Sequence, residues 1–538
     1  MNMQRRELLK SAAALATASL PLSALVLGRA YATGFELKTL GTPQTFDYAW
    51  LKGQARALSA QPYQNRAGAI PASLSGLNWD QWESIGLKEG RALWNNLQLN
   101  ERIRFFHLGW SMRTPVAIYE VVDGQAAQIA YDPAMFDYGK SGVDGASLLK
   151  DLGFSGFQVL GRKDWQRDVA AFQGASYFRA VDGDMQYGMS ARGLAVNSGL
   201  NPEEFPVFTT WWLERPKPGV DSFYVYGLLD SASIAGAYRF LLKLGDSLVM
   251  DVDAALYPRK SIERLGIAPL TAMFLCAEND RRRGEDWRPE IHDADGLQLY
   301  TGTGEWIWRP LVNPPSVHTN SYMDENPRGF GLLQRDRNFD HYQDDGVFYD
   351  LRPSTWVEPV SGPGGPGWGK GAVQLVELPT DDETNDNIVA FWNPAEKPQP
   401  GQELLYSYKL YWCRSLPVAS GLSTVQATRD GIGGVIGQKR TYFSWRFAVD
   451  FVGGALAKLP PGAKVEPVIT ASRGTVEITS ARPLNSIHGW RAMFDIKPTD
   501  DSQEPINLSL VLKSGGKQVS ETWFYQWTPP PPGERRFL

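Results

Sequence analysis

Short strand-like runs dominate the chain between residues 100 and 415, and they constrain its fold more than any other feature. Long helical patterns are nearly absent from this stretch. The clearest runs are rich in β-branched and aromatic residues, end at Gly, Pro, Asp or Asn, and span residues 103–110, 116–122, 222–229 and 247–255. This texture excludes an alternating βα sheet and predicts an all-β fold of antiparallel sheets stacked as a sandwich.

The same texture divides the chain into two β-sandwich domains. The run at 403–412 is predicted to be the last strand of a large unit, because small, loop-forming residues follow it. A second strand-rich segment then extends to Trp527, and its length is typical of an immunoglobulin-like sandwich. We therefore expect a large domain at 33–412 that carries a catalytic cleft, a smaller domain at 413–528, and an extended tail at 529–538.

One helix is predicted near the start of the large domain. Apolar residues recur at helical spacing between residues 47 and 60. Asp47 stands at the first position and has the side chain expected of an N-cap.

The first 32 residues have the features of an export signal. Arg5 and Arg6 precede an Ala- and Leu-rich stretch at 11–27, and the small-x-small pattern of a signal peptidase site follows at 30–32. A membrane anchor is the alternative, but the apolar run is short and is broken by Pro21. We expect twin-arginine export to the periplasm with cleavage near Ala32, and no integral membrane span, because no later run reaches about 18 uninterrupted apolar residues.

Charge and composition exclude several classes of function. The leader holds four basic residues and one acidic residue, so the mature chain has a net charge of −8, against −5 for the whole chain. This charge disfavours nucleic acid as a partner. Two Cys and five scattered His give no metal-ligand spacing, and the Gly-rich segment at 364–371 lacks the Ser or Thr of a phosphate-binding loop. We expect no metal and no cofactor.

Three acidic loops with aromatic neighbours are the candidate functional segments. They lie at 291–296, 340–345 and 381–387. Glycoside chemistry uses one carboxylic acid to protonate the leaving oxygen, one carboxylate to activate water, and flat rings that stack on sugars. Plain turns and calcium sites are the alternatives. The residues alone thus indicate an exported all-β protein that acts on carbohydrate or binds it.

Several longer strings resemble a known family. They occur in one order along the mature chain, at 174–180, 186–195, 229–234, 265–270, 326–333, 356–359, 446–454 and 521–523. Together they resemble the family of periplasmic glucan biosynthesis proteins D and G, and the twin-arginine leader is similar to that of the D branch. The resemblance implies a galactose-mutarotase-like sandwich followed by an immunoglobulin-like domain.

The resemblance also implies a role in the biosynthesis of osmoregulated periplasmic glucans, by inverting cleavage of their β-1,2-linked backbone. Asp386 then resembles the general acid, Asp293 the general base, and Tyr349 a tyrosine along the water relay. The acid of this type acts through a substrate hydroxyl. The implied partners are β-1,2-glucan chains and the periplasmic glucan synthesis machinery. An inverting pair leaves about 6.5–9.5 Å for water, or more where a relay intervenes.

Asp386 needs a raised pKa to serve as an acid near neutral pH. Burial, or the negative charges of Asp381, Asp382 and Glu383, would supply it. Four aromatic residues are candidates for substrate binding, with core packing as their alternative role: Trp306, Trp308, Trp356 and Trp368.

Two segments depart from the family pattern and leave the reaction open. The Pro/Gly insertion at 360–367 is longer than expected, and 431–440 replaces a longer segment associated with hydrolytic relatives. Loops that exclude water would let a sugar hydroxyl accept the glycosyl group, so the reaction is either hydrolysis or transglycosylation. A role as a non-catalytic glucan-binding or assembly factor also stays open, and so does a metal-dependent lyase.

Overall fold

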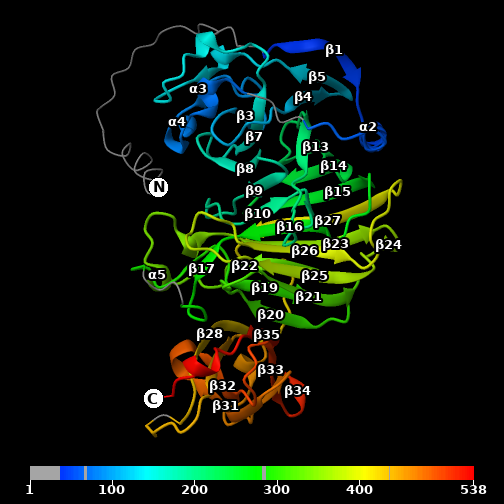
Figure 1. The fold of residues 1–538 in the computed structure, drawn as a ribbon. Coiled ribbons are helices and arrows are strands. Elements are labelled where there is room, and N and C mark those ends of the chain that lie inside the picture. Colours follow the sequence, from blue (N-terminus) through cyan, green and yellow to red (C-terminus); the bar gives the residue numbers. More distant parts are fainter. Residues whose placement is uncertain (1–36, 66–69, 282–285, 436, 538) are drawn as a thin grey trace, which may run out of the picture.

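The computed structural model describes residues 37–65, 70–281, 286–435 and 437–537 of the chain (Figure 1). The predicted leader at 1–32 lies outside these residues. The described chain consists mostly of β-strands, which confirms the all-β fold.

The predicted helix is confirmed. Helix α2 (Tyr48–Ser59) begins directly after Asp47, whose carboxylate accepts a hydrogen bond from the backbone N–H of Trp50 at 2.7 Å. Leu51 and Ala55 on one face of α2 are buried against strands of the first sheet. The other helical segments are short: α3 (Ala72–Ser75), α4 (Trp79–Glu83), α5 (Phe339–Tyr342), and the 3₁₀ turns η1 (Pro133–Met135), η2 (Gly145–Ser147), η3 (Tyr349–Leu351), η4 (Leu456–Lys458), η5 (Asn485–Ile487) and η6 (Pro532–Glu534).

The first sheet is a long ladder that continues through both domains. In order of pairing its strands are β1 (Thr39–Thr45), β5 (Gln125–Ile129), β4 (Ala117–Val122), β12 (Val207–Glu214), β13 (Ser222–Asp230), β14 (Ile234–Lys243), β15 (Leu248–Pro258), β27 (Leu404–Cys413), β23 (Ser354–Gly362), β22 (Gly329–Leu333), β19 (Gly296–Tyr300), β20 (Trp306–Pro310), β35 (Thr522–Trp527), β33 (Ile506–Ser514) and β30 (Glu466–Ala471). Two short strands extend it: β24 (Gly365–Pro366) on β23 and β34 (Lys517–Gln518) on β33.

The second sheet has ten strands and faces the first. Its order is β21 (His318–Glu325), β25 (Lys370–Glu377), β26 (Ile388–Pro394), β16 (Leu265–Ala272), β10 (Ser190–Arg192), β9 (Tyr177–Ala180), β8 (Asp168–Gln173), β7 (Phe154–Gly161) and β3 (Glu101–His107), with β11 (Leu194–Val196) also on β16. Two small hairpins stand apart: β17 (Phe274–Cys276) with β18 (Ile291–His292), and β2 (Gly86–Leu87) with β6 (Phe136–Asp137). The runs predicted from sequence at 103–110, 116–122, 222–229, 247–255 and 403–412 correspond to β3, β4, β13, β15 and β27.

Aromatic side chains from both sheets meet in the core of the large domain. Phe172 of β8 packs against Trp211 of β12 and Phe240 of β14, with ring centroids 5.2 Å and 5.8 Å apart. All three side chains are nearly inaccessible to solvent. Burial of such large apolar surfaces is what holds the two sheets together.

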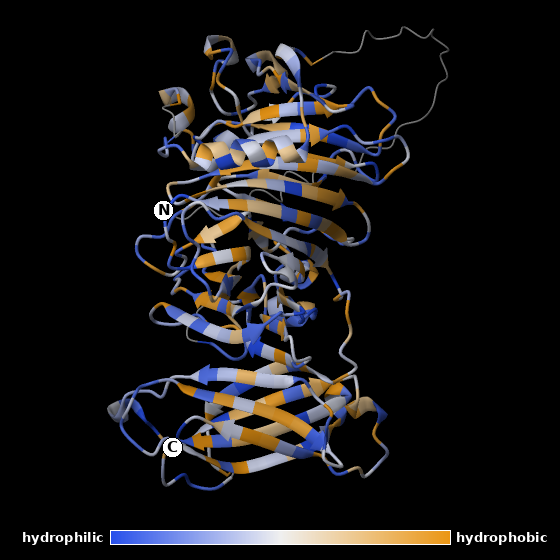
Figure 2. Ribbon diagram, turned by 90° about the vertical axis from the view of Figure 1, so that its right-hand side faces the viewer, coloured by the Kyte–Doolittle hydropathy of each residue, from blue (hydrophilic) through white to orange (hydrophobic). Residues whose placement is uncertain are grey.

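The C-terminal part forms a second, smaller sandwich. Its four-stranded sheet has the order β28 (Thr424–Ile432), β29 (Trp445–Val452), β32 (Gly489–Lys497) and β31 (Thr475–Leu484), and it packs on β30, β33 and β35. Figure 2 shows this sandwich as a separate layer of strands below the large domain. The mutarotase-like and immunoglobulin-like types, and the exact division at 412/413, stay predictions.

The two parts are joined by strand pairing as well as by the chain. Strand β20 of the large domain pairs in parallel with β35, with Ile307 opposite Thr522 and Trp308 opposite Trp523. In Figure 1, β35 lies directly beside β20. The backbone hydrogen bonds of one sheet therefore cross the boundary between the domains.

The segment predicted to be an extended tail contains one short turn. Residues Pro532–Glu534 form a 3₁₀ turn. The guanidinium of Arg535 donates hydrogen bonds to the carbonyl oxygens of Asp500 and Pro530, at 2.6 Å and 3.0 Å. Among the described residues, no helix is long and apolar enough to cross a bilayer.

Candidate active site

The hairpin of β17 and β18 positions Asp293. Phe274 pairs with His292, and Asp293 follows His292 directly. The backbone N–H of Asp293 donates to the carbonyl oxygen of Met273 at 2.8 Å. Asp293 is therefore fixed at the point where β16 ends and β17 begins, and the residue is buried.

The same point of the fold anchors the loop that carries Asp386. The side-chain amide of Asn387 accepts from the N–H of Phe274 at 2.8 Å and donates to the carbonyl of Phe274 at 3.0 Å. The next residue, Ile388, pairs with Ala272 in the second sheet. The segment leading to Asp386 is thus tied to the backbone that also holds Asp293, although the two aspartates are far apart in the sequence.

An ion pair inside the protein holds the Asp293 carboxylate. The guanidinium of Arg352 contacts Asp293 Oδ1, and the two side chains are only 7% and 4% exposed. The Arg352 guanidinium also lies 4.1 Å from the ring centroid of Tyr349. Gly188 gives the Arg352 side chain room, because a Cβ at position 188 would lie 3.0 Å from Arg352 Cβ. Arg352 therefore links the predicted base to the predicted relay tyrosine.

Tyr349 connects this pair to a second group of charges. Its hydroxyl donates to Glu383 Oε2 at 2.7 Å, and the same oxygen accepts from Arg288 at 2.9 Å. Burial raises the pKa of the Tyr349 hydroxyl; Arg352 opposes this, and the carboxylates of Glu383 and Asp293 raise it further. The hydroxyl therefore stays protonated and can pass a proton along a hydrogen-bonded chain.

Arg288 brings two of the acidic loops together. It forms ion pairs with Glu383 and, at 2.7 Å, with Asp344. Burial disfavours the ionised form of Asp344, but hydrogen bonds from Arg288 and from the backbone N–H groups of Val347 and Gly346 outweigh it and lower the pKa of Asp344. The loops at 291–296, 340–345 and 381–387 thus converge on one region.

The surroundings of Asp386 differ from the expected ones. Its side chain is exposed, so burial is not the source of the raised pKa that an acid requires. Glu383 points toward Arg288 and Tyr349, whereas Asp382 accepts from the N–H of Thr384 at 2.8 Å. The expected effect of neighbouring negative charge on Asp386 stays a prediction.

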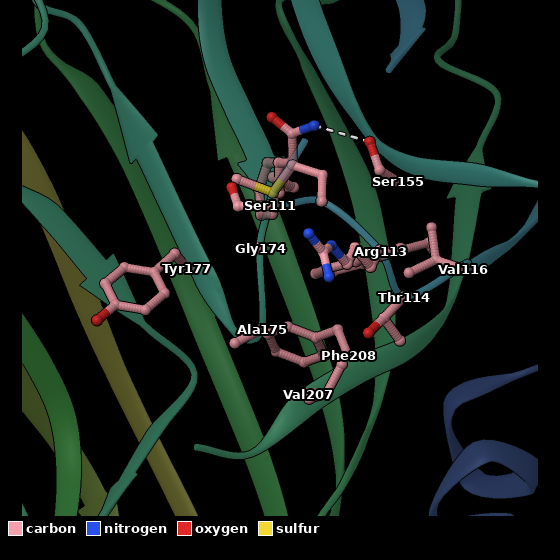
Figure 3. A pocket seen from close by; sticks show the side chains of 14 residues that line it. Ser111, Arg113, Thr114, Val116, Ser155, Gly174, Ala175, Tyr177, Val207 and Phe208 are labelled. Atoms are coloured by element: carbon pink, nitrogen blue, oxygen red, sulfur yellow. Dashed lines mark hydrogen bonds between the residues drawn. The ribbon is translucent and has the colours of Figure 1, made fainter. Parts of the chain in front are cut away.

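The charge of Asp386 is felt at Tyr177 in the second sheet. Burial raises the pKa of the Tyr177 hydroxyl; Arg192 lowers it, and the negative charge of Asp386 raises it. Tyr177 also lines a cavity of about 60 Å³, at one side of it, with Arg113 and Thr114 at the other (Figure 3). In this cavity Ser155 accepts a hydrogen bond from Gln173 at 2.7 Å (dashed in Figure 3).

His292, the residue before Asp293, is buried and surrounded by acidic side chains. His292 Nε2 lies 3.2 Å from Glu290 and 3.6 Å from Asp295. Burial works against the charged imidazole, but the bond to Glu290 and the charges of Asp295, Glu290 and Glu278 outweigh it and raise the pKa of His292 to about 9. His292 is therefore an imidazolium at neutral pH and compensates part of this negative charge.

Three side chains in this region could hold a metal ion. Glu290, Asp336 and His341 each bring one potential ligand atom within 4.8 Å of the others. His341 is already ion-paired with Asp336, and Glu290 with His292. The expectation that the protein uses no metal and no cofactor stays a prediction.

The four tryptophans that were candidates for substrate binding are buried in the hydrophobic core. Their exposed fractions are 6% for Trp306, 3% for Trp308, 0% for Trp356 and 3% for Trp368. Trp306 stacks on Tyr300 and Trp356, and the guanidinium of Arg335 lies 3.6 Å from the ring centroid of Trp308. Because protein atoms cover the rings, the structure favours the core-packing role for all four.

The most important residues that the sequence analysis did not single out are the two arginines. Arg352 lies three residues after Tyr349 in the sequence, and Arg288 precedes the first acidic loop. The signal that could have found them is charge balance, because carboxylates gathered inside a fold need cationic partners.

The fold and the site together define a class: all-β proteins of two stacked sandwiches, with carboxylates, a tyrosine and arginines gathered at one edge of the larger one. Comparison with known proteins identifies the family. Residues 46–527 match the family model described as "Periplasmic glucan biosynthesis protein, MdoG". The chain belongs to this family of periplasmic glucan biosynthesis proteins.

Full-length relatives support the assignment. The chain is 60% identical over 537 residues to "Glucans biosynthesis protein D" of Xanthomonas campestris pv. campestris (strain B100), covering 99% of this chain and 100% of that protein. It is 59% identical over 539 residues to the protein of that name from Xanthomonas oryzae pv. oryzae (strain PXO99A), covering 100% of both. It is 58% identical over 534 residues to the one from Stenotrophomonas maltophilia (strain K279a), covering 99% of both. The family resemblance found in the sequence is thus confirmed.

Proposed function

We propose that the protein cleaves the β-1,2-linked backbone of periplasmic glucans with inversion at the anomeric carbon. Asp386 is the general acid, Asp293 the general base, and Tyr349 lies on the path of the proton. The observation that carries the proposal is the shared anchor of the two aspartates, where Asn387 binds Phe274 and Asp293 binds Met273.

The roles follow from the surroundings of each group. Asp293, held by Arg352, takes a proton from the attacking water or sugar hydroxyl, whose oxygen then bonds to the anomeric carbon. Asp386, at the exposed edge, gives a proton to the departing glycosidic oxygen through a substrate hydroxyl. After each cycle Asp293 has gained a proton and Asp386 has lost one, so Asp293 releases its proton to solvent and Asp386 takes one up before the next cycle.

Mass spectrometry of products from linear β-1,2-glucan tests the proposal. We expect the purified protein to convert the glucan, and Asp386→Asn and Asp293→Asn to lower the rate by about 100-fold or more because each removes one half of the proton transfer. Folding of each variant is checked by its melting temperature. Full activity in either variant contradicts the assigned roles, and glucan binding without conversion by the wild type supports a non-catalytic binding factor.

The same experiment separates hydrolysis from transfer. Hydrolysis creates one new reducing end for each bond cut, whereas transfer to a sugar hydroxyl within the same chain creates a ring and no new end. A reducing-end assay beside the mass spectra therefore identifies the acceptor. Inactivation by a chelator would instead favour a metal-dependent lyase.

Export by the twin-arginine route, with cleavage near Ala32, belongs to the same proposal. The paired Arg5 and Arg6 and the pattern at 30–32 support it. Replacing both arginines by lysine is expected to keep the protein in the cytoplasm, which cell fractionation measures.

A further inference from the structure

A pocket of about 490 Å³ lies between the large domain and the C-terminal sandwich. One wall comes from the segment after β17 and from the segment after β20; the other comes from β28, β29 and β35. The lining residues that matter here are Glu278, Asp280, Val312, Asp430, Trp445 and Trp527.

The wall on the C-terminal side is aromatic. Trp445 and Trp527 stack with ring centroids 6.1 Å apart and ring planes 17° apart, and Phe443 stacks on Trp527 at 6.4 Å and 20°. Trp445 is half-buried, and its indole N–H donates to Asp430 Oδ2 at 3.0 Å. This bond fixes the orientation of a ring that lines the pocket.

The wall on the large-domain side is acidic and held in place. Asp280 accepts from the backbone N–H of Asn313 at 2.8 Å. Glu278 accepts from the backbone N–H of Thr428 at 2.8 Å, across the domain boundary. Carboxyl groups and aromatic rings therefore line a space of the size that small-molecule sites occupy.

This pairing of groups suits a neutral sugar. A tryptophan packs against the C–H face of a pyranose ring, while carboxylate oxygens accept hydrogen bonds from its hydroxyl groups. Asp280, Asp430 and the cationic Arg281 line the space together with Glu278, so the lining offers hydrogen-bond donors and acceptors rather than a surface of one charge. We infer that this pocket is an accessory binding site for glucosyl units of the glucan, separate from the site of cleavage. The inference rests on the proposed function.

The pocket and the candidate active site share a scaffold. The side-chain amide of Asn313 donates to the carbonyl oxygens of Leu275 and Thr380, at 3.1 Å and 2.9 Å, and accepts from the N–H of Thr380 at 3.0 Å. Leu275 belongs to β17, and Thr380 leads into the loop that carries Asp386. A glucan bound at the pocket is therefore held on the same framework as the reacting groups.

The test compares Trp445→Ala with Trp79→Ala, a matched loss of a partly exposed tryptophan in α4. Binding of a long linear β-1,2-glucan is measured by calorimetry in an Asp386→Asn background, and cleavage of short β-1,2-oligosaccharides in the wild-type background. We expect Trp445→Ala to weaken binding of the long glucan by about tenfold, and Trp79→Ala to leave it unchanged. Cleavage of short oligosaccharides should be the same in both.

Two further variants guard against a folding defect. Trp445→Phe keeps an aromatic ring and should restore most of the binding, and Glu278→Gln replaces a carboxyl group without emptying space and should weaken it. Unchanged binding in both Trp445→Ala and Glu278→Gln overturns the inference. A change of oligomeric state in Trp445→Ala with unchanged glucan binding also overturns it, in favour of a contact between two copies. If the wild type binds glucan through Trp445 but cleaves none, the proposed function fails and the accessory site stands.

Discussion

Asp293 and Arg352 form an ion pair that solvent hardly reaches. Removing one member of a buried pair leaves the other charge uncompensated, which costs more than the pair itself contributes. Replacing either Asp293 or Arg352 is therefore expected to disturb the other residue as well. Under the proposed function Arg352 is a positioning residue, because it contacts Asp293 and the Tyr349 ring.

Replacing Arg352 by Met is expected to lower kcat/KM on β-1,2-glucan by about 100-fold. It should also move the acidic limb of the pH–rate profile to higher pH, since a buried carboxylate without its cation takes up a proton more readily. The profile is measured from product formation between pH 4 and pH 9. Arg352→Lys keeps the charge and should keep the limb near its original position. A wild-type profile in Arg352→Met would refute the positioning role.

The variant Tyr349→Phe tests whether the Tyr349 hydroxyl takes part in the proposed proton transfer. The variant keeps the ring beside Arg352 but loses the hydroxyl that donates to Glu383. We expect kcat to fall by about 100-fold or more while the affinity for glucan stays close to that of the wild type, because proton transfer and not binding is lost. Unchanged kcat would remove Tyr349 from the relay.

At the scale of elements, α2 depends on its cap. Asp47→Ala removes the acceptor of the Trp50 N–H and is expected to cost about 1 kcal/mol of unfolding free energy. Chemical denaturation measures this loss. Asp47→Ser, which retains a capping oxygen, is the matched control and should lose far less. An equal loss in both variants would mean that the cap bond contributes nothing.

The elements show what the sequence could and could not predict. The start of α2 and the positions of several strands could be predicted from the sequence, because helix caps and short runs of β-branched residues are local signals. The bond between Asn387 and Phe274 was not, because it joins residues 113 positions apart and depends on strand register. The roles of Trp306 and Trp308 were ambiguous, since tryptophan serves both cores and sugar sites.

At the scale of the whole molecule, stability should fall as the pH rises from about 5 to 9. Burial and the charge of Glu290 raise the pKa of Glu278 to about 8, and that of His292 is about 9. Both groups hold a proton in the folded state that the unfolded chain releases at lower pH. The folded state therefore binds more protons in this range, and its advantage is lost as the pH passes through these values.

Melting temperatures at pH 5 and pH 9 test whether the stability falls as the pH rises. We expect a decrease on the order of a few degrees for the wild type. Glu278→Gln cannot release a proton at this position and should show a smaller decrease. A wild-type melting temperature that rises toward pH 9 would contradict the linkage.

The parallel pairing of β20 with β35 has a consequence for motion. Hydrogen bonds of one continuous ladder connect the domains at Ile307 and Trp308, so opening the boundary as a hinge would require breaking strand pairing. The spacing between the tryptophan wall and the acidic wall is consequently preset. A ligand that binds there finds both walls of the pocket already in place, so none of its binding free energy is used to bring them together.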